Sequence, residues 1–210
     1  MKRKRVLAAT VFAVAALFAG PGQAAEMNYV FGDFISGEDG KSFPQSPQFA
    51  KLNVKTDAAS DSWTFRLYDV DLDIFGESAF FGSLAVDGII GSEGVDVTST
   101  ESSFGLNSVG VDAGSGPGGV FDFRFDLDEG QTRLTTGNYV KWTATGISSV
   151  SSYAGHIQGI GDNGEFSAWY GADPSPIPLP ATVWLLGSAL LGFSGFKKFI
   201  RARKGGLTPA

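Results

Sequence analysis

The chain has no cysteine among its 210 residues. This absence excludes disulfides, cysteine nucleophiles and thiolate-bound metals. There is a single histidine, His156, so any histidine-dependent catalytic triad would have to use it. No G-x-S-x-G nucleophile motif accompanies it between residues 25 and 173. We therefore expect a structural histidine and a protein that is not an enzyme.

Basic residues are scarce in the long central part of the chain. All 22 acidic residues lie between Glu26 and Asp173, where only seven Lys or Arg occur, so this body carries a formal charge of −15. Phosphate backbones are bound by clustered Lys and Arg, so we expect no nucleic-acid partner. The charge is compatible with a hydrated surface, with bound cations or with basic partners.

The body also lacks the 3.6-residue periodicity of an amphipathic helix. What recurs is alternation of apolar and polar residues, typical of half-buried strands. The apolar positions of the alternating segments are Ala50, Leu52 and Val54; Trp63, Phe65 and Leu67; Phe80, Leu84 and Val86; Phe121, Phe123, Phe125 and Leu127; and Val140, Trp142 and Ala144. Glycine-rich stretches separate them and predict turns.

Many short strands with glycine-rich connections indicate an all-β fold, a two-layer antiparallel sandwich that is jelly-roll-like. About 150 residues suffice for one core without disulfides. We expect residues 27–172 to form it, as the structured part of an ectodomain spanning residues 25–173. The expected buried aromatic residues are Trp63, Phe65, Phe121, Phe123, Phe125 and Trp142.

The N-terminus has the three parts of a secretory signal peptide. Four cations at residues 2–5 precede an apolar run, Val6–Gly20, and small residues precede a cleavage site between Ala24 and Ala25. About 15 apolar residues are few for a membrane-spanning anchor, which needs about 20. We therefore expect residues 1–24 to be removed after export by the Sec machinery and signal peptidase.

Three aspartates alternate in the segment DVDLD. Asp69, Asp71 and Asp73 would share one face of a strand, and Ca²⁺ prefers such carboxylate oxygens. The EF-hand pattern fails, because Ile74 stands where its glycine is needed and Phe80 where its glutamate is needed. A solvated strand face is the favoured interpretation, Ca²⁺ binding the alternative, and no other cofactor is expected.

The C-terminal region combines prolines, an apolar segment and a basic tail. Pro174, Pro176, Pro178 and Pro180 predict an extended stalk over residues 174–180. Residues 181–200 predict a transmembrane helix, short against a bilayer core of about 30 Å. Residues 201–210 form a basic tail that we expect on the cytoplasmic side. The cations that we expect to end membrane insertion, in the last part of the helix and in this tail, are Lys197, Lys198, Arg201, Arg203 and Lys204.

This arrangement resembles the PEP-CTERM sorting signal, in particular its V-P-L-P-A variety. The matching residues are Ile177, Pro178, Leu179, Pro180 and Ala181, followed by a Val183–Gly192 segment typical of that family. Ile177 replaces the usual valine, and the glutamate of the P-E-P variety is absent. A sortase signal is excluded, because Val183 stands where L-P-x-T-G needs glycine. An ordinary permanent anchor is the alternative.

The resemblance implies a Gram-negative envelope protein that is processed by an exosortase-type membrane protease. Its expected route runs from a membrane intermediate, with the ectodomain in the periplasm, to the cell surface or extracellular matrix. The body, including the segment Ala154–Gly161, is similar to acidic ectodomains that carry this signal, and no activity comes with that similarity.

Three classes of function follow. We favour a non-enzymatic surface or matrix protein linked to exopolysaccharide or biofilm. A carbohydrate- or calcium-binding β-sandwich is the alternative, and exposed Trp or Tyr beside an acidic cluster at a sheet edge would distinguish it. A hydrolase of envelope polymers is the third and would need a cleft with two facing carboxylates.

Overall fold

The computed structural model describes residues 25–57, 59–113, 116–127 and 130–175. The chain divides into a unit of residues 1–175 and a unit of residues 176–210, and all described residues belong to the first. Ten strands and two short 3₁₀ helices make up the described part. Their bounds are β1 Ala25–Gly37, β2 Ala50–Asp57, β3 Ser62–Tyr68, η2 Asp73–Phe75, β4 Phe80–Ile90, β5 Asp96–Ser102, β6 Gly110–Asp112, η3 Pro117–Gly119, β7 Phe123–Asp126, β8 Val140–Thr145, β9 Ile147–Ile160 and β10 Phe166–Pro174.

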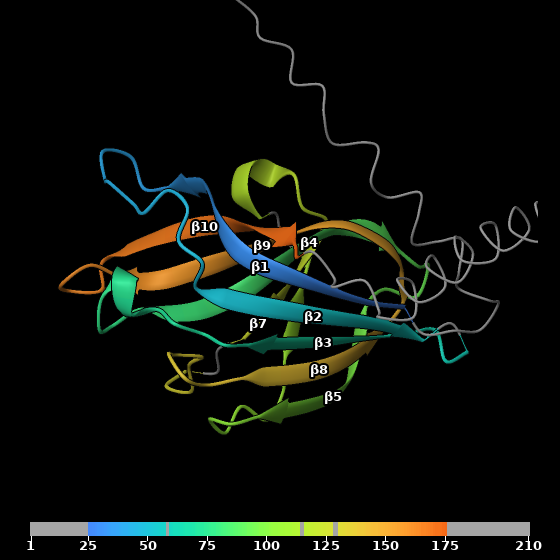
Figure 1. Ribbon diagram of the computed structural model, residues 1–210. Coiled ribbons are helices and arrows are strands. Elements are labelled where there is room, and N and C mark those ends of the chain that lie inside the picture. Colours follow the sequence, from blue (N-terminus) through green and yellow to red (C-terminus); the bar gives the residue numbers. More distant parts are fainter. Residues whose placement is uncertain (1–24, 58, 114–115, 128–129, 176–210) are drawn as a thin grey trace, which may run out of the picture. The chain divides into compact units, whose positions relative to one another are not determined.

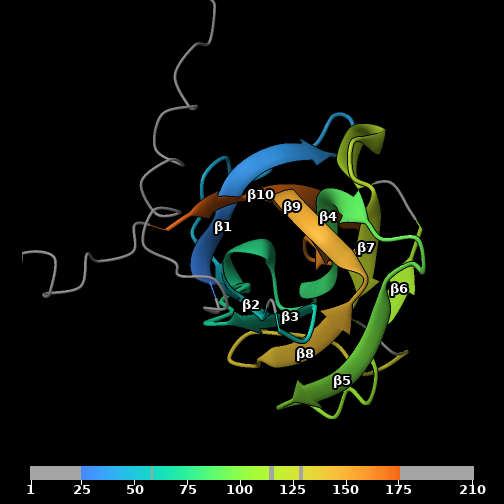
Figure 2. The same ribbon diagram turned by 90° about the vertical axis from the view of Figure 1, so that its right-hand side faces the viewer.

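The strands form one antiparallel sheet in the order β5-β8-β3-β2-β1-β10-β9-β4-β7-β6. Figure 2 shows the sheet rolled into a nearly closed ring, which brings β5 and β6 near each other at its two edges. Among the described residues no hydrogen-bonded ladder joins these two edge strands. The prediction of an all-β antiparallel fold is confirmed.

The expected division into two separate sheets is not observed. Opposite halves of the single sheet instead pack face to face, as the ring centroids of Phe65 on β3 and Phe125 on β7 show by lying 5.1 Å apart. Tyr29 on β1 and Tyr153 on β9 lie on strands separated only by β10, and their ring centroids are 4.9 Å apart at the edge of the core. Ten strands in one sheet also differ from the eight-stranded double sheet of a jelly roll.

Alternation places the core residues as expected in three strands. Ala50, Leu52 and Val54 of β2, Phe65 and Leu67 of β3, and Val140, Trp142 and Ala144 of β8 are all buried. The residues between them face outward because successive side chains of a strand point to opposite sides. These strands therefore present one apolar face to the core and one polar face to water.

Two of the six aromatic residues expected in the core are only partly buried. Phe65, Phe123, Phe125 and Trp142 are at most 1% exposed. Trp63 lies at the start of β3, packs against the rim of the core and donates its indole N–H to the carbonyl oxygen of Ile147 at 2.8 Å. Phe121 precedes β7, so the alternation from Phe121 to Leu127 does not belong to a single strand.

A bulge changes the expected pattern of β4. The register with β9 shifts between Phe81 and Ser83, which turns Phe81 toward the core beside Leu84 and Val86. Phe80 is also buried, at 6% exposed, but it lies outside the core cluster. It lies instead beneath the Arg133 guanidinium, 4.2 Å from its ring centroid.

Candidate functional site

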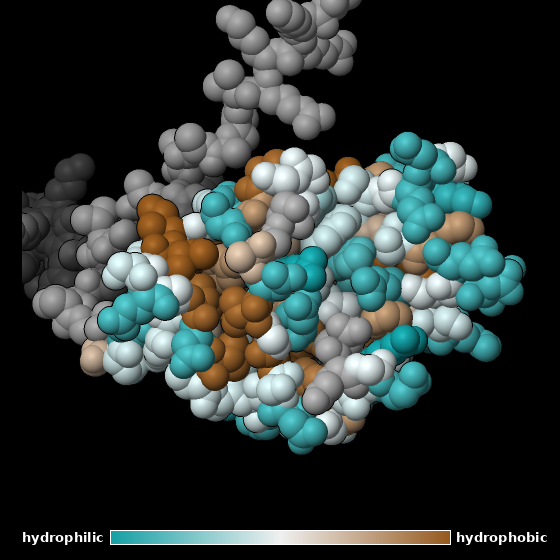
Figure 3. All heavy atoms as spheres, turned by 180° about the vertical axis from the view of Figure 1, so that it is seen from behind, coloured by the Kyte–Doolittle hydropathy of each residue, from teal (hydrophilic) through white to brown (hydrophobic). Residues whose placement is uncertain are grey.

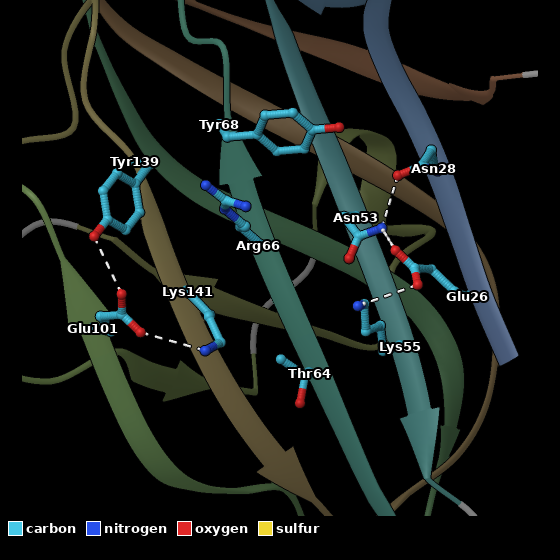
Figure 4. Close-up of a pocket in the computed structure, with 10 residues that line it drawn as sticks. All are labelled: Glu26, Asn28, Asn53, Lys55, Thr64, Arg66, Tyr68, Glu101, Tyr139 and Lys141. Carbon is cyan, nitrogen blue, oxygen red and sulfur yellow. Dashed lines mark hydrogen bonds and ion pairs between the residues drawn. The ribbon is translucent and has the colours of Figure 1, made fainter. Parts of the chain in front are cut away.

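An open pocket of about 730 Å³ lies on the outer face of five neighbouring strands, β1, β2, β3, β8 and β5. We call it the polar pocket, and its lining residues are Glu26, Asn28, Asn53, Lys55, Thr64, Arg66, Tyr68, Glu101, Tyr139 and Lys141. Figure 4 shows their side chains on the same side of the sheet, with Tyr139 coming from the coil just before β8 and the others from the strands. Because the apolar residues of these strands face the core, alternation leaves polar side chains for this surface.

Strand register aligns five of these residues in one row across the sheet. Asn28 pairs with Asn53, Asn53 with Arg66, Arg66 with Lys141, and Lys141 with Glu101. Neighbouring strands lie about 4.8 Å apart, so the row extends over about 19 Å with Arg66 at its centre.

Two ionic groups flank Arg66. On one side the Lys55 ammonium lies 3.1 Å from the Glu26 carboxylate, which also accepts a hydrogen bond from the Asn53 amide at 2.8 Å. On the other side the Lys141 ammonium lies 3.3 Å from Glu101. The Glu101 carboxylate also accepts the Tyr139 hydroxyl at 3.1 Å.

These contacts keep both carboxylates ionised. Hydrogen bonds from Asn53 and Lys55 lower the pKa of Glu26 below its ordinary value. Hydrogen bonds from Lys141 and Tyr139, with the nearby charge of Arg66, lower the pKa of Glu101. A glycosidase needs one carboxylic acid with a raised pKa as proton donor, and neither glutamate has that property. The polar pocket can thus bind hydroxyl and charged groups, but it lacks the protonated carboxyl group that a glycosidase uses as proton donor.

His156 lies on a different part of the outer surface. Its ring stacks on that of Trp169 with centroids 4.3 Å apart, and its Nδ1 lies 3.2 Å from the Gln158 amide nitrogen. Burial, with a smaller contribution from the charge of Arg124, lowers the pKa of His156 to about 4. The imidazole is therefore neutral at pH 7.

The neighbours of His156 include serine and aspartate in an order unsuited to a catalytic triad. Register places Ser83 between His156 on one side and Asp126 on the other. In a triad the histidine lies between the serine and the aspartate and bonds to both. Asp126 instead accepts a hydrogen bond from Arg124 at 2.9 Å. This surface does not assemble the charge arrangement of a serine hydrolase.

Asp69, Asp71 and Asp73 do not form a strand face, contrary to the sequence prediction. β3 ends at Tyr68, Asp69 has a φ of 50°, and Asp73 begins η2. Asp69 pairs with Lys51 at 2.9 Å, and Asp73 accepts a hydrogen bond from Thr136 at 2.9 Å. Within the part of the chain that the structure describes, no group of three or more acidic or histidine side chains is arranged to hold a metal ion.

An apolar area occupies another side of the molecule. Figure 3 shows it among polar residues on the side that faces away from the viewer in Figure 1. Over all sides of the part of the chain that the structure describes, the large apolar side chains that are more than a third exposed are Ile35, Ile74, Ile89, Ile90, Val111 and Val120. Ile90 and Val111 lie on β4 and β6, the two neighbours of β7.

The sequence-predicted processing sites lie outside the described residues, apart from Ala25, which begins β1. These are Ala24, the sorting motif Ile177, Pro178, Leu179, Pro180 and Ala181, and the basic residues Lys197, Lys198, Arg201, Arg203 and Lys204. No helix in residues 25–57, 59–113, 116–127 or 130–175 has the length and apolar character to cross a membrane.

The polar pocket was missed by reasoning from sequence alone. Alternation marks Asn53, Arg66 and Lys141 as outward-facing, but only the strand order β8-β3-β2 brings them side by side. Comparison of the chain with family models, curated proteins and solved structures finds no match. Any functional conclusion about the body must therefore rest on the geometry of the polar pocket.

Proposed function

We propose that this protein is an exported, non-enzymatic surface or matrix protein whose body binds saccharide through the polar pocket. The observation that carries the proposal is the pocket itself, with tyrosines and hydrogen-bonding side chains around two ionised glutamates. Amphipathic rings and a few fixed polar groups are typical of sites for small polar ligands.

The route to the surface is part of the same proposal. Residues 1–24 act as the signal peptide, and residues 174–210, of which Pro174 also ends β10, act as the sorting signal with its stalk, transmembrane helix at 181–200 and basic tail. An exosortase-type protease then processes the chain near Ile177–Ala181. The support is the order of these segments and their resemblance to PEP-CTERM signals.

Hydrolysis and calcium binding have less support. Hydrolysis lacks a protonated carboxyl group in the polar pocket, because both glutamates have lowered pKa values. Calcium binding was based on a shared strand face that Asp69, Asp71 and Asp73 do not form.

A binding and cleavage assay tests the proposal. Full-length protein purified in detergent is mixed with exopolysaccharide from its native host, and the polymer is sedimented. We expect the protein to sediment with the polymer without releasing new reducing ends. Release of reducing ends would identify a hydrolase, and absence of both sedimentation and cleavage would contradict saccharide binding.

A further inference from the structure

Arg66 is distinguished from most cations of the body by forming no ion pair with a carboxylate. Lys51, Lys55, Arg124 and Lys141 each form an ion pair with a carboxylate. No described residue accepts a hydrogen bond or forms an ion pair with the exposed Arg66 guanidinium. Its N–H groups are therefore available to an anionic ligand, although the body as a whole carries a formal charge of −15.

Two tyrosines hold this guanidinium in place. Its central carbon lies 5.2 Å from the ring centroid of Tyr68 and 5.5 Å from that of Tyr139. Figure 4 shows Arg66 between these two side chains, above the sheet. Contacts with aromatic rings restrain the guanidinium while its N–H groups stay available to a planar carboxylate.

The position of Arg66 in the row favours a negatively charged ligand. It lies directly opposite Lys141 on β8, and like charges in opposite positions of a sheet repel each other. Glu101 forms its ion pair with Lys141, whereas Arg66 interacts with this carboxylate only at longer range. A carboxylate bound between the strands would give Arg66 a direct partner and could accept two parallel hydrogen bonds from it.

We propose that the polar pocket binds an acidic saccharide, with the ligand's carboxylate on Arg66 and its hydroxyls on the flanking groups. The inference rests on the saccharide binding proposed above and specifies its ligand class. Asn28, Thr64 and Glu26 offer donors and acceptors on one side, and Glu101 offers acceptors on the other. The pocket volume of about 730 Å³ lies within the range usual for small-ligand sites.

The same residues disfavour a dense polyanion such as nucleic acid. Phosphate-backbone binding relies on several cations that are free to neutralise phosphates. In the polar pocket Lys55 and Lys141 are already compensated by Glu26 and Glu101. These carboxylates would repel closely spaced phosphates. The pocket therefore fits a saccharide in which carboxylates are separated by uncharged rings.

The test compares two tetrasaccharides that differ only in charge. The acidic one alternates glucuronate with N-acetylglucosamine, and the neutral one is its carboxyl-reduced form. Full-length protein in detergent is titrated with each by calorimetry. A hydrogen-bonded charge pair contributes about 1.5–3 kcal/mol. We therefore expect Arg66→Gln to weaken binding of the acidic form by about 10- to 100-fold and to leave binding of the neutral form nearly unchanged.

Two further variants serve as controls. Arg66→Lys keeps the charge but loses the planar fork, so an intermediate loss is expected. Arg133→Gln removes another arginine that lies over an aromatic ring, that of Phe80, outside the polar pocket, and should not alter binding. Unchanged thermal midpoints of the variants confirm that they fold.

The outcomes separate this inference from the function it rests on. Equal binding of both tetrasaccharides, tighter binding of single-stranded DNA, or full acidic binding by Arg66→Gln overturns the acidic ligand class. Failure of both tetrasaccharides to bind also overturns it. If the host polymer still sediments with the protein in these cases, the proposed saccharide binding stands; if it does not, both proposals fail.

Discussion

The imidazole of His156 is largely buried in the folded protein. Its ring stacks on Trp169, and burial lowers its pKa from 6.5 to about 4 in the folded protein. Between pH 4 and pH 6.5 the unfolded chain therefore binds a proton that the folded chain does not. The neutral imidazole therefore makes its full contribution to stability above pH 6.5, and this contribution is lost as the pH falls from 6.5 to 4.

A variant without the imidazole isolates this effect. The free energy of unfolding of the wild type should be about 1–2 kcal/mol lower at pH 5 than at pH 7.5. This value is discounted because the ring is partly exposed to solvent. His156→Gln should lack this loss. Urea unfolding of both proteins at the two pH values measures it. The same pH dependence in both would show that His156 is not the group responsible.

Burial of single residues could be predicted from sequence where alternation was regular. Phe65 and Trp142, for example, are fully buried as expected. The partial exposure of Trp63 depends on its place at the start of β3, at the rim of the core, where Ile147 offers a carbonyl oxygen. That contact joins residues 84 positions apart, and no local pattern specifies it.

At the scale of elements, the turn between β8 and β9 depends on one glycine. Gly146 has a φ of 79°, and a Cβ atom there would collide with the carbonyl oxygen of Gly94. Its own carbonyl accepts a hydrogen bond from Gly91 at 2.8 Å. The turn after β4 and the turn after β8 are thus in direct backbone contact.

A matched pair of glycine substitutions separates backbone strain from this contact. Gly137 has a φ of 80° but no atom within 4 Å of an added Cβ. Gly137→Ala should cost about 1–2 kcal/mol from the left-handed conformation alone. Gly146→Ala should lower the free energy of unfolding by about 1–3 kcal/mol more than Gly137→Ala, because the added Cβ also displaces the backbone at Gly94. Urea unfolding measures both. Equal losses would mean that the Gly94 contact is unimportant.

Strands with regular alternation were predictable as elements, and irregular ones were not. β2, β3 and β8 match their predicted segments, because each keeps one apolar face throughout. The bulge in β4 and the absence of a strand in the segment after β3 are set by partners and by backbone conformation. Asp69, with its φ of 50°, directs the chain out of the sheet, so the alternation in DVDLD was misleading.

For the whole molecule, the fold class was predictable and the strand order was not. Alternation says which side of a strand is apolar, but not which strands are neighbours. The single rolled sheet and the row through Arg66 both result from the order β5-β8-β3-β2-β1. The candidate site could therefore not be derived from sequence, although alternation identified its residues on β2, β3 and β8 as outward-facing.

The distribution of charge along the chain links the body to its proposed route. The acidic body lies between two basic terminal regions, each next to an apolar segment. Such positive flanks are expected on the cytoplasmic side of a membrane. A permanent anchor needs only apolar length and the basic stop, whereas a protease substrate also needs an extended backbone outside the membrane. Pro178 and Pro180 would hold the chain in that form.

Mass spectrometry of the mature protein from its native host tests this account most directly. We predict a new C-terminus close to Ile177–Ala181 in the wild type. Replacing Pro178, Leu179 and Pro180 by alanine should leave the chain full-length and membrane-bound, because the cleavable stalk is lost. Retention of residues 197–210 by the wild-type protein under all growth conditions would contradict the account and identify the segment as a permanent anchor.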